Sequence, residues 1–299
     1  MIKPWIEAMR LRTLPVSLAG VVAGIGCAVW HGCFSVVAAV LCLLFALFAQ
    51  VASNFGNEYY DFVNVVDKRG REGFRRGVTE GDIAPRDMKR ATFLMLVAAA
   101  LVGCAMLPIG GWWLLPVGCV IVLFALAYSA GPYPLSHHGL GDVAVVLFFG
   151  VVPVNLTCYL QCGSFDALAL SFPVSLAVGL LAANVLIVNN YRDEEDDRSV
   201  GKHTTVVIFG GRVMGRVYLL SGFVAMFVML PVWLRLPVYA VLVPVVYLCL
   251  HTIVWRKLVA SRGAAINPLL GRTAINLLLF SLLLFVVFLL APKFSVICC

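Results

Sequence analysis

Residues 35 to 61 read SVVAAVLCLLFALFAQVASNFGNEYYD, and this stretch decides the fold. Residues 35 to 57 carry no charged side chain, and they exceed the roughly 20 residues that a helix needs to cross a bilayer. The run is continuously apolar rather than alternating, which favours a helix over a strand of a membrane barrel. Amide and acidic side chains follow at once. The stretch therefore predicts a membrane-spanning helix that ends in a polar site.

Apolar runs of this length recur along the whole chain. Of its 299 residues, 62% are hydrophobic and 12% charged, and the mean hydropathy is +0.99, which is outside the range of soluble domains. We predict an all-α polytopic membrane protein, with nine transmembrane helices in one bundle and a single transmembrane domain over residues 1–299. The first run has the length of a span and no small-residue cleavage site, so we expect a retained helix rather than a signal peptide. The predicted spans cover residues 14–32, 35–57, 91–108, 112–129, 142–160, 168–190, 214–234, 237–255 and 273–291.

Lysine and arginine fall almost entirely on one side of this predicted bundle. With nine spans the connecting segments alternate between the two faces, and 20 of the 22 basic residues lie on the face of the N-terminus. Arg235 and Lys293 are the two on the other face. The positive-inside rule then predicts a cytoplasmic (inner) membrane protein with its N-terminus and both long polar segments in the cytoplasm. The net charge of +7 follows from this face, so we expect contact with membrane lipid and none with nucleic acid.

Acidic residues concentrate in two segments of that cytoplasmic face. Seven of the fifteen lie between Glu58 and Asp87, and five form the run from Asp193 to Asp197. Both segments begin where a predicted span ends, and their first residues are alike, Asn-Glu-Tyr-Tyr-Asp and Asn-Asn-Tyr-Arg-Asp. The second and sixth helices are therefore predicted to hold equivalent places in a pseudo-repeat of two halves.

Helical spacing arranges these residues into two polar stripes. Residues three, four and seven positions apart share one face of a helix. Polar groups at the end of a span indicate function unless the fold pairs them. The first stripe comprises Asn54, Asn57, Glu58 and Asp61, with Asp67 in the following loop, and the second comprises Asn190, Asp193 and Asp197.

Facing carboxylates with basic residues between them suit a magnesium ion and a diphosphate. Mg²⁺ prefers oxygen ligands and is commonly shared between carboxylates and substrate phosphates, while arginine and lysine neutralise the remaining phosphate charge. Each basic residue can equally be an inside-facing membrane anchor. A diphosphate at the mouth of an apolar bundle predicts an amphiphilic substrate with its lipid tail between helices. The basic candidates are Lys68, Arg75, Arg76, Arg192 and Lys202.

The ten cysteines are expected to act mainly as small apolar packing residues inside the spans. Cys158 and Cys162 share a helix face near a span end, and Cys298 and Cys299 close the sequence. Neither pair matches a zinc, haem or lipidation signature.

Taken together, the motifs resemble the UbiA superfamily of intramembrane aromatic prenyltransferases, and its 1,4-dihydroxy-2-naphthoate branch in particular. Asp67 follows Asp61 by six residues, as in that branch, whereas the 4-hydroxybenzoate branch has its next aspartate four residues on, where this chain has Val65. Glu58 departs from the usual aspartate of the first motif. The matching stretches are Arg12-Thr-Leu-Pro15, Asn57 to Asp61, Tyr128-Ser-Ala-Gly-Pro132, Gly139-Leu-Gly-Asp142, Phe148-Phe-Gly150, Asn189 to Asp197 and Gly201-Lys-His-Thr204.

The resemblance implies a Mg²⁺-dependent transfer of a polyprenyl group from polyprenyl diphosphate to 1,4-dihydroxy-2-naphthoate, with release of diphosphate and CO₂, in menaquinone biosynthesis. It implies catalytic roles for Asp61, Asp193 and Tyr128, the last with its ring against the allylic cation. Arg12 is the candidate for the carboxylate of the acceptor. The implied metal ligands are Glu58, Asp61, Asp67, Asp193 and Asp197, and the implied substrate-binding residues are Asn57, Lys68, Arg75, Asn190, Arg192 and Lys202.

Three other functions stay open at this point. Another aromatic acceptor, such as 4-hydroxybenzoate, would fit the same family. A secondary transporter also uses repeats and intramembrane polar residues, but its charged residues are expected near the bilayer midplane rather than at one face. A phosphotransferase acting on lipid alcohols also uses aspartates with Mg²⁺, but its Asp-Gly…Ala-Arg…Gly…Asp…Asp signature is missing from the sequence.

Overall fold

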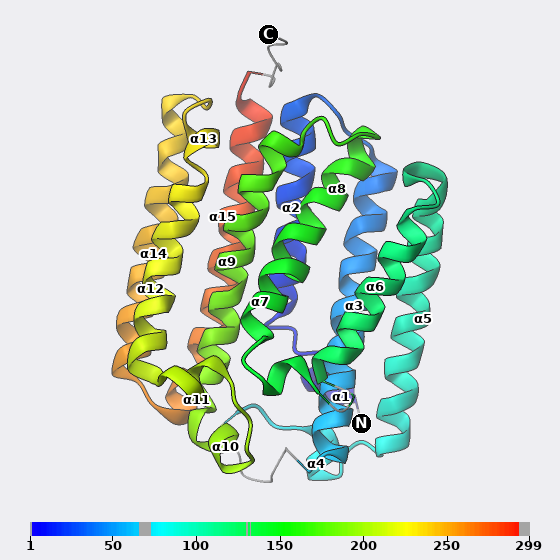
Figure 1. The fold of residues 1–299 in the computed structure, drawn as a ribbon, viewed down its shortest axis with the longest axis vertical. Coiled ribbons are helices and arrows are strands. Elements are labelled where there is room, and N and C mark those ends of the chain that lie inside the picture. The colour runs from blue at the N-terminus through cyan, green and yellow to red at the C-terminus, as the bar shows by residue number, and fades with distance from the viewer. Residues whose placement is uncertain (1, 66–72, 130, 132, 293–299) are drawn as a thin grey trace.

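The computed structural model describes residues 2–65, 73–129, 131 and 133–292, and within them the chain forms a bundle of helices. Most of the helices run along the long axis of the molecule (Figure 1). The described residues contain one isolated bridge, between His138 and His203, and no strand. The all-α prediction is therefore confirmed.

Eight helical stretches of the described chain are long and apolar enough to cross a membrane. The predicted span at 112–129 corresponds to α6 (Leu114–Ser129), an apolar helix of 16 residues that is shorter than the others. The count of nine spans therefore stays a prediction, as does the pseudo-repeat. The eight stretches are α2 (Leu14–His31), α3 (Val36–Val63), α5 (Pro85–Gly110), α7 to α8 (Gly141–Cys162), α9 (Leu168–Arg192), α12 (Gly211–Val228), α14 with its preceding turn (Val238–Ala260) and α15 with its preceding turn (Gly263–Leu290).

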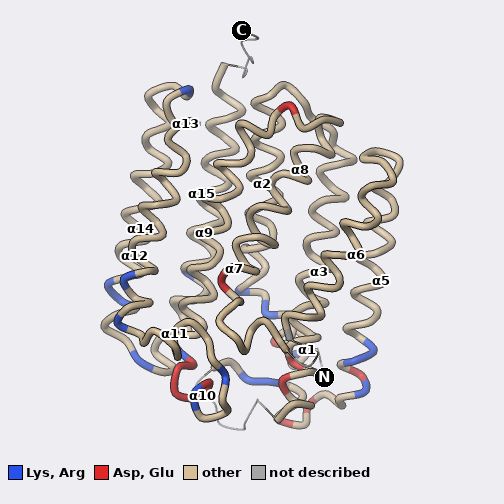
Figure 2. The backbone as a smooth tube through the Cα atoms, viewed as in Figure 1, with Lys and Arg blue, Asp and Glu red and all other residues tan. Residues whose placement is uncertain are grey.

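Short helices cover the ends of the bundle. Near the N-terminus lie α1 (Ile2–Ala8) and α4 (Gly77–Glu80), and the segment after α9 forms α10 (Glu194–Ser199) and α11 (Thr205–Phe209). At the other end α13 (Leu230–Trp233) precedes α14 (Leu242–Ala260). Lys and Arg gather at the end that holds α1, α4 and α10, while α13, which Arg235 follows in the sequence, lies at the opposite end (Figure 2).

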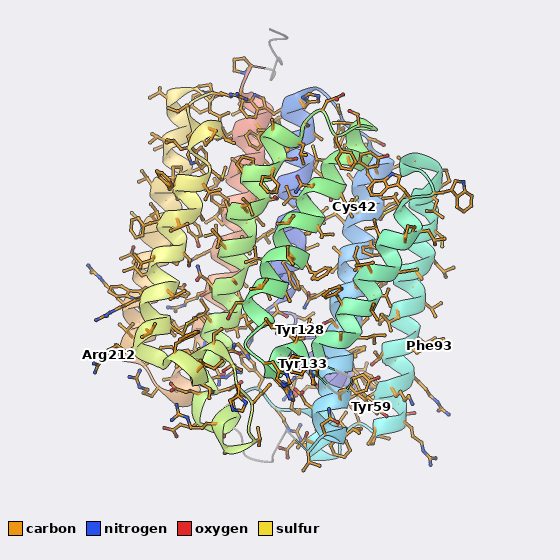
Figure 3. The ribbon with its side chains drawn as sticks, viewed as in Figure 1. Cys42, Tyr59, Phe93, Tyr128, Tyr133 and Arg212 are labelled. Carbon is orange, nitrogen blue, oxygen red and sulfur yellow. The ribbon has the colours of Figure 1, made fainter. Side chains whose placement is uncertain are left out.

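The outer surface of the bundle is apolar. Phe93 on α5 is 65% exposed and points away from the bundle (Figure 3), and Leu101 and Phe227 are exposed to a similar degree. A soluble monomer rarely exposes so much large apolar surface. These side chains therefore fit contact with lipid.

Glycines allow the central helices to touch through their backbones. A Cβ atom on Gly150 would lie 2.4 Å from the backbone of Gly179 in α9, and one on Gly20 of α2 would lie 2.7 Å from the carbonyl oxygen of Phe149. Gly24 is equally close to the carbonyl oxygen of Val154, at 2.6 Å. Small residues at crossings are the usual means by which membrane helices pack. Together these three close contacts hold α2, α8 (Val152–Cys162) and α9 against one another.

Between α7 (Gly141–Val145) and α8 the helix widens into a π-helical segment, Val146–Val151. Pro153 follows this segment, and because proline has no N–H it cannot donate to the carbonyl group four residues before it, that of Phe149. π-segments often mark functional sites. Here the wider turn places Phe148 and Phe149 on the wall of the central cavity.

Candidate active site

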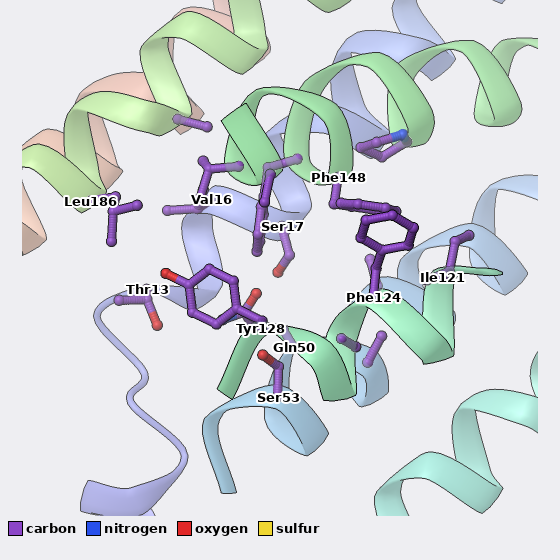
Figure 4. A pocket seen from close by; sticks show the side chains of 18 of the residues that line it. Thr13, Val16, Ser17, Gln50, Ser53, Ile121, Phe124, Tyr128, Phe148 and Leu186 are labelled. Carbon is purple, nitrogen blue, oxygen red and sulfur yellow. The ribbon is translucent and has the colours of Figure 1, made fainter. Parts of the chain in front are cut away.

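A cavity of about 340 Å³ lies inside the bundle, and its lining changes from polar to apolar along its length. The polar part is formed by the ends of α3 and α9 and by the segments that follow α1 and α10. The apolar part extends along α2, α6 and α8, and Figure 4 shows Phe124 and Phe148 next to each other on this wall. Polar lining residues are Arg10, Asn54, Asn57, Asp61, Arg76, Tyr128, Ser136, Asp142, Asn189, Asn190, Asp193, Lys202, Thr204 and Thr205, and the deep apolar end includes Cys42, Phe45, Met106, Leu114 and Leu160.

Asp61 reaches the cavity from the last turn of α3. Its side chain is 2% exposed, and none of the residues that the structure describes donates a hydrogen bond to its Oδ1 atom. Asn57, one turn earlier, also lines the cavity and accepts a hydrogen bond from the guanidinium of Arg10. A buried carboxylate oxygen without a donor is costly in the absence of a ligand. The Asp61 carboxylate is thus available to a cation.

Asp193 lies at the end of α9 and is paired with its sequence neighbour. Nε and Nη2 of Arg192 each donate to one carboxylate oxygen of Asp193 at 2.7 Å, and both side chains are almost fully buried. Arg192 also donates to Oδ1 of Asn189 at 2.8 Å and of Asn267 at 3.1 Å. Asp193 lines the cavity, whereas Arg192 does not. Arg192 therefore holds Asp193 in position.

Asp197 and Lys202 form the second ion pair of this segment. Nζ of Lys202 lies 3.6 Å from Oδ1 of Asp197, and the backbone N–H of Lys202 donates to the Asp197 carbonyl at 2.9 Å. Thr204 follows, and its hydroxyl accepts from the N–H of Val207 and so caps the start of α11. Lys202 lines the cavity, whereas Asp197 does not. The acidic run thus bends back so that a lysine faces the same space as Asp61 and Asp193.

Tyr128 and Asp142 also line the polar end of the cavity. Figure 4 shows Tyr128 among Thr13, Ser17 and Gln50. Asp142 accepts from Oγ1 of Thr205 at 2.6 Å, and the described residues donate nothing to its other oxygen.

His137 lies next to Ser136, which lines the polar end of the cavity. Its backbone carbonyl accepts from the N–H of His203 at 2.9 Å, which ties this loop to the segment around Lys202. Burial, and then the charge of Lys202, lower the pKa of His137, so its imidazole is neutral at pH 7. This loop carries no motif of its own in the sequence.

Among the described residues, five predicted site residues do not line the cavity, namely Asp197, which pairs with Lys202 as described, and Glu58, Arg75, Arg12 and Arg192. Glu58 accepts from the N–H of Val78 at 3.1 Å and so holds α4 against α3. Arg75 pairs with Asp82 at 2.7 Å and is half exposed. Arg12 packs over the ring of Phe74 at 4.3 Å, and Arg192 pairs with Asp193 as described.

Neighbouring arginines line the cavity in place of Arg75 and Arg12, and one of them, Arg76, is also among the basic candidates from the sequence. Arg76 lines the cavity instead of Arg75, and Arg10 lines it instead of Arg12. Arg10 follows α1 in a turn with φ of 52°, a conformation that the sequence pattern does not reveal. Predicted residues Asp67 and Lys68 lie outside the described residues.

Taken alone, the polar end combines carboxylates from two helices with three basic side chains. The carboxylates are those of Asp61 and Asp193, and the basic side chains are those of Arg10, Arg76 and Lys202. Within the described ranges no three His, Cys, Asp or Glu side chains come close enough to hold a metal ion by themselves. The arrangement suits a cation that takes further ligands from a phosphate-bearing substrate.

Replacing Arg192 with alanine is expected to destabilise the fold by about 3 to 5 kcal/mol, because a buried carboxylate would lose its partner. Thermal unfolding of the purified protein in detergent would measure this change. The matched control is Arg198→Ala, which breaks the exposed pair between Arg198 and Glu194 and should cost about 1 kcal/mol or less. Equal melting temperatures for both variants would contradict the positioning role of Arg192.

Comparison with known proteins agrees with this geometry. The family model described as the UbiA prenyltransferase family matches residues 17–270. The 1,4-dihydroxy-2-naphthoate octaprenyltransferase of Escherichia coli (strain K12) is 38% identical over 69% of this chain and 68% of its own length. The enzyme of the same name from Haemophilus influenzae is 36% identical over 73% of this chain and 72% of its own length.

The fold is also that of a solved structure. A UbiA homolog from Archaeoglobus fulgidus, bound to GPP and Mg²⁺, superposes with a TM-score of 0.70 over 95% of this chain and 99% of that chain, at 18% identity. The family model covers most of the sequence, so the resemblance drawn from the motifs is confirmed. The chain is therefore a member of the UbiA prenyltransferase family.

Proposed function

We propose that this protein transfers a polyprenyl group from polyprenyl diphosphate to 1,4-dihydroxy-2-naphthoate, releasing diphosphate and CO₂ and forming demethylmenaquinol. The names of the relatives that are 34 to 38% identical to this chain over the aligned residues support this acceptor. The observation that carries the proposal is the cavity. Asp61 and Asp193, 132 residues apart in sequence, line its polar end, and the rest of it is apolar.

A magnesium ion fits the polar end. The Asp61 oxygen without a donor and the Asp193 carboxylate are hard ligands on two helices, whereas Asp197 does not line the cavity. When bound, the ion neutralises charge on the diphosphate and so makes it a better leaving group. Asp67 is also proposed as a metal ligand, on the basis of the sequence alone. Glu58 is a weaker candidate for a metal ligand, because its Oε1 atom already accepts a hydrogen bond from the N–H of Val78.

The protein's own residues hold the donor substrate by its two ends. Arg76 and Lys202 face the position of the diphosphate and can donate to its oxygens, and Asn57 and Asn190 belong to the same polar lining. The apolar part of the cavity takes the first isoprene units and excludes water from the allylic carbon. As the bond to diphosphate breaks, the ring of Tyr128 stabilises the positive charge on the prenyl group.

The acceptor attacks the prenyl group with a ring carbon, which loses its carboxyl group as CO₂. Arg10 is better placed than Arg12 to meet the carboxylate of the acceptor, because Arg10 lines the cavity. We also propose that the polar end faces the cytoplasm of a bacterial inner membrane, on the basis of the clustered lysines and arginines (Figure 2). Another aromatic acceptor, such as 4-hydroxybenzoate, is the alternative.

Turnover is expected to require a divalent cation. Purified protein given polyprenyl diphosphate and 1,4-dihydroxy-2-naphthoate should release diphosphate with Mg²⁺, lose this activity when EDTA is added, and regain it when Mg²⁺ is returned in excess. Omitting the acceptor serves as the control for simple hydrolysis. Undiminished prenyl transfer in EDTA would contradict the metal site.

A further inference from the structure

Figure 1 shows that α2 and α8 both end at the end of the bundle opposite to α1, α4 and α10, and four cysteines lie in or just after the last turns of these two helices. Cys27 lies near the end of α2 and Cys33 in the loop after it, while Cys158 and Cys162 lie in the last two turns of α8. Cys27 and Cys158 are buried in the main apolar core, and Cys33 and Cys162 pack against its edge. The function proposed above uses none of them.

Three of these residues are near neighbours. Cys162 has the thiols of both Cys33 and Cys158 beside it, and Cys33 and Cys162 pack against the core cluster that contains Cys158. The two loops are also held together beside them, because the N–H of Ser35 donates to Oε1 of Gln161 at 2.6 Å although the two residues are 126 positions apart. The loop after α2 therefore lies directly on the end of α8.

Two of the four cysteines are suited to form a disulfide with each other. Cys158 and Cys162 are one turn apart on the same helix, where their Cβ atoms point along the helix in parallel, which disfavours a disulfide between them. Cys33 approaches Cys162 from a separate loop. Cys33 and Cys162 are partly exposed, while Cys27 and Cys158 are buried. An external reagent can therefore reach Cys33 and Cys162.

We propose that Cys33 and Cys162 form a disulfide bond on the face of the membrane away from the basic residues. If that face lies outside the cytoplasm, as the positive-inside rule predicts, it is the face on which disulfides persist. The oxidant is the disulfide of an exchange partner. One cysteine thiolate attacks that disulfide and releases a first thiol, and the second cysteine attacks the resulting mixed disulfide and releases a second thiol. Both electrons thus pass to the partner.

The bond would stabilise the deep end of the cavity. Leu156, Thr157 and Leu160, which precede Cys162 on α8, line that end. A cross-link between α8 and the loop after α2 closes a long stretch of chain, which restricts the unfolded state. The oxidised protein should therefore melt at a higher temperature than the reduced protein.

Oxidation of the purified full-length protein in lipid nanodiscs tests the proposal. Samples are treated with oxidised glutathione or with dithiothreitol, labelled with a maleimide and analysed by peptide mass spectrometry and thermal unfolding. We expect oxidised glutathione to remove two maleimide-reactive thiols, to yield a peptide that joins Cys33 to Cys162, and to raise the melting temperature.

Variants separate this pair from the other cysteines. Cys33→Ser and Cys162→Ser should each abolish the cross-linked peptide and the rise in melting temperature. Cys158→Ala, next to the pair, and Cys104→Ser, exposed on α5, should retain both effects. The proposal is overturned if Cys33 and Cys162 remain fully reactive to maleimide after oxidation, carry only glutathione adducts, or if the recovered link joins Cys158 to Cys162.

Discussion

Replacing Asp61 with asparagine is expected to lower the rate of prenyl transfer by at least about 100-fold, with the fold intact. Asparagine has nearly the same shape as aspartate but removes the charge that would bind the cation. None of the described residues donates to Oδ1 of Asp61, so the substitution breaks no hydrogen bond there. The rate is measured as diphosphate released in the presence of donor and acceptor, and the melting temperature confirms that the protein is folded.

Asp61 is a cleaner test of the metal site than Asp193. Asparagine at position 193 would also leave the buried guanidinium of Arg192 without its counter-charge, so loss of activity would mix with loss of stability. The control for Asp61→Asn is Asp87→Asn, at the exposed start of α5, which should keep full activity. Wild-type turnover in the Asp61 variant would remove the carboxylate from the proposed mechanism.

Replacing Gly150 with leucine is expected to prevent folding or to cost at least about 3 kcal/mol. The Cβ atom alone would lie 2.4 Å from backbone atoms of Gly179, and backbone cannot move aside as a flexible side chain can. The contact joins the π-helical segment to α9, which also carries Asp193. Loss of monodisperse protein in size-exclusion chromatography, or a large fall in melting temperature, would show the effect.

Gly118→Ala on α6 is the matched control for Gly150. A Cβ atom there meets nothing within 4 Å, and alanine favours helix more than glycine does, so stability should hold or rise slightly. If Gly150→Leu and Gly118→Ala behave alike, the close crossing of the π-helical segment and α9 is not what holds this part of the bundle together.

The sequence predicts the helices and the polar end of the site because both depend on local patterns. The apolar run before Asn57 sets the length of α3, and helical spacing puts Asn57 and Asp61 on the face that lines the cavity. The same spacing groups Glu58 with them. It does not reveal that α4 folds back and donates the N–H of Val78 to Glu58.

The choice between neighbouring arginines also depends on tertiary contacts. Arg75 and Arg76 are adjacent in a segment that precedes α4, where Arg76 has an extended backbone, so the two side chains leave the chain in different directions. Arg75 meets Asp82 in the turn after α4, and Arg76 is left to face the cavity. The spacing of residues in the sequence does not indicate which of the two arginines forms an ion pair with Asp82.

The measurement that tests the central claim most directly is the release of labelled CO₂ during prenyl transfer. Purified protein is given Mg²⁺, polyprenyl diphosphate and 1,4-dihydroxy-2-naphthoate labelled in its carboxyl group, with 4-hydroxybenzoate in a parallel reaction. We predict one CO₂ and one diphosphate for each demethylmenaquinol formed, and no product from 4-hydroxybenzoate. Prenylated 4-hydroxybenzoate without any product from the naphthoate, or a prenylated naphthoate that keeps its carboxyl group, would contradict the account.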